Sequence, residues 1–253
     1  MMPLEFAFGL LILTFGSYLL GAWLHIKHHA DFFGKETGSV INNSRMALLV
    51  LAMFSISAVL VSSKTGFESK AKDIRIQASK FIYLNQVLNE YGDKSVGVKL
   101  AAKEFLEDEI DLISAAQSDL SQKKRAITGG KMKELLESVI NLEPQNEIQK
   151  DLKQTALNIC HDIAISKWLT LEELGSGILW PLVILITIWL VVIFLSFGVI
   201  STLTRAEIIY FFALSVCIST AVYLPLELDL PFRGVIHVSH EPLVIALKVL
   251  SQQ

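Results

Sequence analysis

The chain has 253 residues, 52% of them hydrophobic, and its mean hydropathy is +0.50. This apolar content exceeds that of an ordinary soluble domain, so we expect part of the chain to face lipid. Its 22 basic and 25 acidic residues give a net charge of -3, which argues against the clustered basic surface of a nucleic-acid-binding protein. Two cysteines, Cys160 and Cys217, are too few for a disulfide framework and match no metal-binding spacing.

Four segments almost free of charged residues are long enough to cross a bilayer as helices. They cover residues 6–24, 46–62, 178–200 and 208–226. Short polar links predict that the first two and the last two spans form hairpins. No basic residue precedes the first span, so it lacks the start of a cleaved signal peptide and we expect it to remain attached. No ionisable side chain lies deep in a span, which disfavours a proton-coupled pump.

The region between the second and third spans is polar, and its apolar residues recur every three or four positions, as in amphipathic helices. The first of these helices continues out of the second span and should end at Gly92. Others are expected over 96–125, 132–142 and 146–174. The sequence therefore predicts an all-α polytopic membrane protein with four transmembrane helices and an inserted helical domain between spans two and three. Its predicted parts are a transmembrane hairpin, the helical insert, a second transmembrane hairpin and a C-terminal segment, over 1–63, 64–177, 178–226 and 227–253.

Strong catalytic and nucleotide-binding motifs are absent from the sequence, so we expect neither an enzyme nor a cofactor. The spacing of His25, His28 and His29 would gather them on one helical face, where they could bind a metal or sense protons. We favour the alternative that they are interfacial polar residues beside Lys27, and we expect no metal site. An acidic run is typical of a solvated helix face; it comprises Glu104, Glu107, Asp108, Glu109 and Asp111.

Small residues on the first span, at Gly9, Gly16 and Ser17, predict the close approach of another helix. The C-terminal segment reads as a helix exit, in which Pro231 cannot continue the fourth span and Gly234 permits a turn.

The same segment resembles the signature of the bestrophin-like family of four-span membrane proteins, a family largely of unknown function. The pattern is Glu-Leu-Asp-x-Pro-Phe-x-Gly-x-Ile, followed by Ser and Pro-Leu. It is met by Glu227, Leu228, Asp229, Pro231, Phe232, Gly234, Ile236, Ser239, Pro242 and Leu243. Two further blocks are similar to the family, at Ser62-Ser63-Lys64 with Phe67 and from Trp189-Leu190 to Ser196-Phe197-Gly198. The spacing of the three blocks and the length of the insert also resemble the family, so the similarity extends over nearly the whole chain.

This resemblance implies a homo-oligomeric ion channel in the plasma membrane or inner membrane, most simply for small anions, with the insert and both termini on the cytoplasmic side. The positive charges of the short loops favour the opposite orientation. The alternative function is a non-conducting membrane scaffold or sensor whose helical insert binds a partner. Glu227 and Asp229 could cap the exit or pair with Lys64, or they could form an acidic ring at a pore mouth.

A pore without buried charge would need another polar lining, and the second span offers the hydroxyls of Ser55, Ser57 and Ser62. These serines could equally bond back to carbonyls of their own helix. Basic residues follow on the same predicted helix and could concentrate anions at an entrance; they are Lys70, Lys72 and Arg75.

Overall fold

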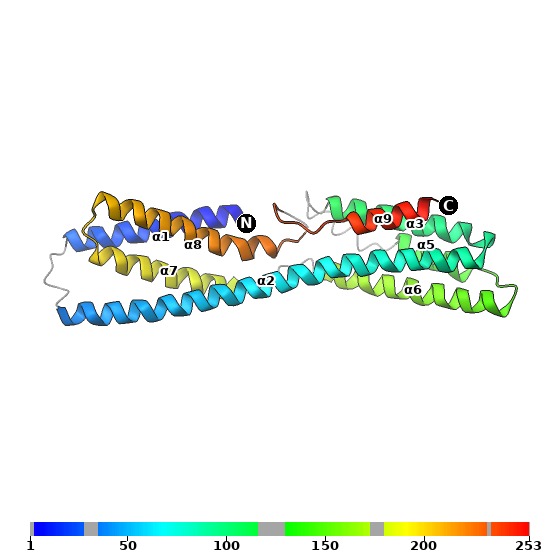
Figure 1. Cartoon of the computed structure of the whole chain (residues 1–253), viewed down its shortest axis with the longest axis horizontal. Helices are drawn as coiled ribbons and strands as arrows, with labels where there is room; N and C mark the ends of the chain where they lie inside the picture. Colours follow the sequence, from blue (N-terminus) through cyan, green and yellow to red (C-terminus); the bar gives the residue numbers. More distant parts are fainter. Residues whose placement is uncertain (1–2, 28–34, 116–129, 173–179, 232–233, 253) are drawn as a thin grey trace. The chain divides into compact units, whose positions relative to one another are not determined.

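The computed structural model describes residues 3–27, 35–115, 130–172, 180–231 and 234–252; within these ranges the side chains of 35–42, 114–115 and 168–172 are not described. The described elements are helical, which confirms the all-α prediction (Figure 1). In chain order they are α1 (Pro3–Lys27), α2 (Lys35–Tyr91), the short 3-10 helix η2 (Asp93–Ser95), α3 (Val96–Ala115), α5 (Gly130–Ile140), α6 (Glu147–Glu172), α7 (Trp180–Ile200), α8 (Arg205–Leu228) and α9 (Glu241–Ser251).

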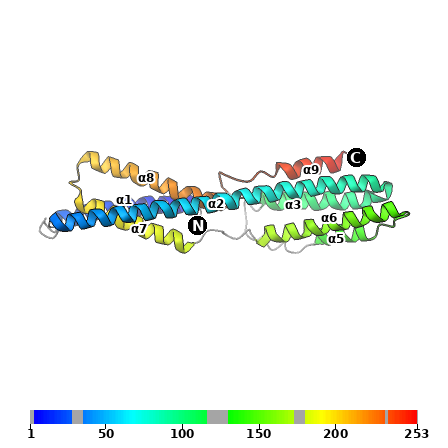
Figure 2. The same ribbon diagram turned by 60° about the horizontal axis from the view of Figure 1, so that its bottom comes forward.

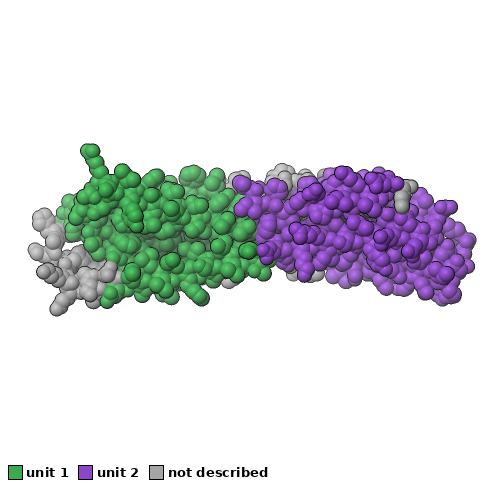
Figure 3. Space-filling model, in the orientation of Figure 1, with its two compact units in different colours: residues 1–65, 177–229 green, residues 66–176, 230–253 purple. Residues whose placement is uncertain are grey.

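The chain forms two compact units (Figure 3). The first unit holds residues 1–65 and 177–229, and the second holds 66–176 and 230–253. Four helices are long and apolar enough to cross a membrane, namely α1, α2, α7 and α8, which confirms the predicted spans. The second span and the first helix of the insert are one uninterrupted helix, α2, so this helix contributes to both units.

In the first unit, α1 packs along α7 and α8. The tightest approach is between two glycines, because a Cβ atom at Gly21 of α1 would collide with the Leu195 carbonyl of α7, and one at Gly198 of α7 would collide with the Tyr18 carbonyl of α1. Glycine is therefore required on both helices. The sequence predicted such a contact at Gly9 and Gly16. A Cβ atom at either glycine would meet nothing within 4 Å, so neither makes a close helix contact within the subunit.

One end of this unit is closed by a polar network around the link between α7 and α8. The Tyr18 hydroxyl lies 2.8 Å from the Ser201 hydroxyl, which in turn donates to the Glu207 carboxylate at 2.8 Å. Glu207 also completes a capping box with Thr204, the N-cap residue of α8. The Tyr18 ring stacks on Phe211 with centroids 4.3 Å apart. The start of α8 is thus fixed by both hydrogen bonds and aromatic packing.

The second unit has its own hydrophobic core, built from α2, α3, α5, α6 and α9. α2 ends where predicted, at Gly92, whose φ of +99° suits glycine. α3 then returns along α2, so that the Phe81 and Phe105 rings lie 5.8 Å apart. α9, which lies along α3 (Figures 1 and 2), was not expected as a helix, and it contributes Leu243, Ala246 and Leu250 to this core. The insert and α9 therefore share one hydrophobic core.

The glycine contact between α1 and α7 generates the first prediction. Gly21→Ala should lower the thermal unfolding temperature of the detergent-purified protein, because the new methyl group forces the helices apart at a cost of about 1–3 kcal/mol. Gly16→Ala on the same helix is the matched control, and it should leave stability unchanged or slightly raised, since space is open there. Equal unfolding temperatures for the two variants would contradict the proposed contact.

Candidate functional site

The family-like signature forms the exit of α8 and the start of α9. Glu227 is buried, and Tyr223, one turn earlier in α8, is a hydrogen-bond partner of its carboxylate. Asp229 is the C-cap residue of α8, and its backbone N–H donates to the Pro225 carbonyl at 3.1 Å. α8 ends before Pro231, which is itself buried. This geometry supports a structural role for both acidic residues.

The rest of the signature turns the chain. Gly234 has a φ of +102°, in the region that favours glycine, and the Val238 N–H closes the turn on the Pro231 carbonyl at 2.7 Å. The Ser239 hydroxyl accepts from the Glu241 N–H, and Pro242 stands in the first turn of α9, where a missing N–H costs nothing. Phe232 lies outside the described residues.

The three candidate pore serines divide between two sides of α2. Ser55 and Ser62 are seven residues apart and share one side, whereas Ser57 is turned by roughly 200° from Ser55 at 3.6 residues per turn. The Ser57 hydroxyl donates back to the Met53 carbonyl of its own helix at 2.8 Å, as the alternative interpretation anticipated. The inner side of α2 in this unit is formed by other residues, among them Ile56 and Val59. Ser55, which is half-buried one turn before Val59, borders this inner side, whereas Ser62 is exposed.

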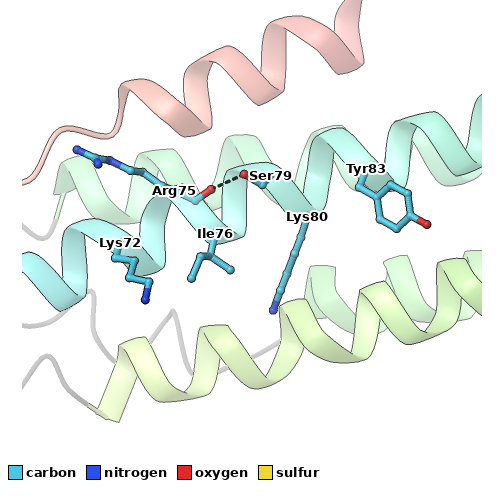
Figure 4. Close-up of a pocket in the computed structure, with 6 residues that line it drawn as sticks. All are labelled: Lys72, Arg75, Ile76, Ser79, Lys80 and Tyr83. Carbon is cyan, nitrogen blue, oxygen red and sulfur yellow. Dashed lines mark hydrogen bonds between the residues drawn. The ribbon is translucent and has the colours of Figure 1, made fainter.

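The three candidate entrance residues do not all lie in one place. Lys72 and Arg75 line a groove of about 400 Å³ on the second unit, together with Ile76, Ser79, Lys80 and Tyr83, whereas Lys70 is half-buried and does not line it. Lys72, Ile76 and Lys80 extend to the side of α2 that faces α6, and Arg75 extends away from them (Figure 4). The Lys80 ammonium bonds the Asp162 carbonyl at 3.1 Å and the Ser166 hydroxyl at 2.9 Å, which fixes it beside α6.

A buried polar group inside the second unit was missed by sequence reasoning. Glu109, predicted to lie on a solvated face, is buried with Gln77 and Lys167, and the prediction was wrong for this residue because α3 turns it toward the core. Burial raises the pKa of the Glu109 carboxyl, the Gln77 amide and the Lys167 ammonium lower it by less, and Asp108 adds to the rise. The Lys167 ammonium lies 4.7 Å from the centre of the Phe105 ring.

Metal and thiol chemistry find little support in the described residues. No group of three or more histidine, cysteine or acidic side chains could hold a metal ion within that part of the chain. His25 lies at the end of α1, but His28 and His29 fall outside the described ranges. Burial raises the pKa of the Cys160 thiol to about 12, so it stays protonated at neutral pH and is a poor nucleophile.

The four apolar helices and the helical second unit define a polytopic α-helical membrane protein. Residues 13–243 match the family model of the bestrophin-like domain, so the chain belongs to the bestrophin-like family. No curated protein and no solved structure matches it.

The buried carboxyl generates the second prediction. Because its pKa is raised in the folded state, that state binds the proton more tightly than the unfolded chain does. The free energy of unfolding should therefore fall as the pH rises above 4.5, until the folded-state pKa is passed. In Glu109→Gln this contribution disappears, and the variant should become more stable than the wild type toward pH 8. Thermal unfolding of the full-length protein at about pH 5 to pH 8 measures the difference.

Glu134→Gln is the matched control, since Glu134 is an exposed residue of α5 in the same unit. It should keep the pH dependence of the wild type. Identical pH dependence for Glu109→Gln and the wild type would contradict the assignment.

Proposed function

We propose that the protein is a homo-oligomeric, anion-conducting channel whose pore is lined by α2. Membership of the bestrophin-like family supports a channel. The observation that carries the assignment of α2 is its poor coverage within the subunit. Of the most apolar 18-residue window of each span, 11% is buried in α2, compared with 33% in α1 and α7 and 22% in α8. The membrane part of α2 is therefore left to contact lipid or other subunits.

The side chains on one side of α2 favour other subunits over lipid alone. Serines recur every seven residues at Ser55, Ser62 and Ser69. Ser62 and Ser69 are exposed, and Ser55 is half-buried. A seven-residue repeat keeps one side of a helix facing an axis when several helices pack around it. Hydroxyl groups on that side can line a water-filled path without the cost of placing a charge in the membrane.

Charge outside the membrane supports selectivity for anions. Lys70, Lys72 and Arg75 follow the serines on the same helix, and Lys72 and Arg75 are exposed. A basic ring around a symmetric entrance would raise the local concentration of small anions. In this proposal the channel sits in a plasma membrane or inner membrane, and the insert and both termini face the cytoplasm.

Chloride efflux from liposomes containing the purified protein tests the proposal. Ser62→Trp should reduce the chloride flux by about tenfold or more, because the indole would fill a path lined by hydroxyls. Ser55→Trp should act in the same direction.

Ser57→Trp is the matched control, since Ser57 lies on another side of the same helix, and the flux should be retained. Equal effects of the substitutions at 57 and 62 would contradict a pore along the Ser55–Ser62 side. An assembled protein that passes no small ion under varied calcium, pH and voltage would favour the alternative, a membrane scaffold or sensor whose insert binds a partner.

A further inference from the structure

The second unit exposes two helix faces of opposite charge. The basic face lies on α2 and consists of Lys72, Ile76, Ser79, Lys80 and Tyr83, and it is bordered by Arg75, which extends away from Lys72 and Lys80 (Figure 4). The acidic face lies on α3 and consists of Val96, Leu100, Glu104, Glu107 and Asp111. Each face combines charged side chains with apolar ones that are largely open to solvent, a combination found where one helix packs on another.

On the basic face, Ile76 and Tyr83 are the apolar elements. They are 40% and 51% exposed and stand seven residues apart, so they share one side of α2. Lys72 lies one turn before Ile76 and Lys80 one turn after it, and both point to the same side as Ile76 (Figure 4). The two bonds from Lys80 to α6 hold its ammonium in place. The face therefore offers a fixed positive charge beside an apolar surface.

On the acidic face the spacing also follows one side of a helix, at steps of four, four, three and four residues. Val96 and Leu100 are 62% and 57% exposed. Two lysines lie near the carboxylates, since Lys103 pairs with Glu107 at 3.9 Å and Lys131 reaches the Glu104 backbone carbonyl at 3.5 Å. Three carboxylates against these two lysines leave the face negative.

The order of the two faces along the chain makes them complementary. On α2, Lys72 and Arg75 come first and Tyr83 last, with Lys80 between Ile76 and Tyr83 but bonded to its own α6. On α3 the apolar residues come first and the carboxylates last. The opposite charges and the apolar residues of the two faces come together when the two helices run antiparallel. Within one subunit, α3 runs antiparallel to α2. In a ring whose axis follows α2, the α3 of a neighbouring subunit would have this direction.

We propose that the basic face of α2 binds the acidic face of α3 from a neighbouring copy of the same chain. The antiparallel register brings Lys72 to Glu107, Arg75 to Glu104 and Tyr83 to Val96 of the neighbour. The two faces differ, so each subunit uses its basic face toward one neighbour and its acidic face toward the other. Such head-to-tail contacts generate a ring when the rotation between subunits closes. This interface deepens the proposed function, because it rests on the homo-oligomer while naming the surfaces that join the subunits. With Lys72 and Arg75 used for assembly, Lys70 alone of the three candidate entrance residues would remain for the entrance.

Charge reversal on the full-length protein tests the interface. Lys72→Glu with Arg75→Glu should raise the concentration at which half the subunits dissociate by about tenfold or more, because carboxylates would then face carboxylates. Glu104→Lys with Glu107→Lys should do the same. The four changes combined should return dissociation to within about threefold of the wild type, since the charges are exchanged and not lost. Mass photometry of detergent-solubilised protein measures each distribution.

The matched control is Lys133→Glu with Lys150→Glu, which alters the net charge equally at exposed lysines of α5 and α6. It should leave assembly unchanged. A wild-type oligomer that tolerates the reversals, or a fourfold variant that fails to recover, would overturn this interface and leave the channel proposal standing. A wild-type protein that is monomeric at every concentration would overturn both.

Discussion

The structure depends on the continuity of one helix. α2 runs for 57 residues, so its backbone hydrogen bonds are satisfied internally both where it crosses the membrane and where it enters the second unit. Its coverage by the rest of the subunit differs greatly between the two parts. Phe81, Leu84 and Leu88 are fully buried in the core of the second unit, whereas only 11% of the membrane window is buried. The helix is anchored outside the bilayer and exposed within it.

That contrast links the two proposals. A membrane helix that packs little within its own subunit can contact lipid or symmetry-related copies. Packing between helices drives association in a bilayer, so contacts with other copies are favourable. The tight pair of Gly21 and Gly198 consolidates α1 and α7 without α2. Outside the membrane, the basic and acidic faces supply contacts that would set how neighbouring copies of α2 are spaced. The pore and the interface would thus be two consequences of one helix.

Much of the architecture could be predicted from the sequence, because span length, hydropathy and apolar periodicity report burial directly. The signature also located the turn at Gly234, where backbone conformation demands glycine. The packing of the helices against one another was harder to predict. Nothing in the spacing of Gly9 and Gly16 shows that the close approach occurs at Gly21, and Glu109 resembles its solvated neighbours until α3 is placed against the core. The two sides occupied by Ser55 and Ser57 could have been separated by helical arithmetic. α9 had a readable signal, since Leu243, Ala246 and Leu250 keep helical spacing after Pro242.

The central claim is that the Ser62 side of α2 faces the axis of an oligomer. Pulsed electron resonance between spin labels on neighbouring subunits measures this most directly, with Cys217→Ser removing the exposed native thiol. Labels at Ser62→Cys should give shorter intersubunit distances than labels at Ile12→Cys, an exposed position of α1. Distances at Ser62 that equal or exceed those at Ile12, or an absence of any dipolar coupling between subunits, would contradict the account.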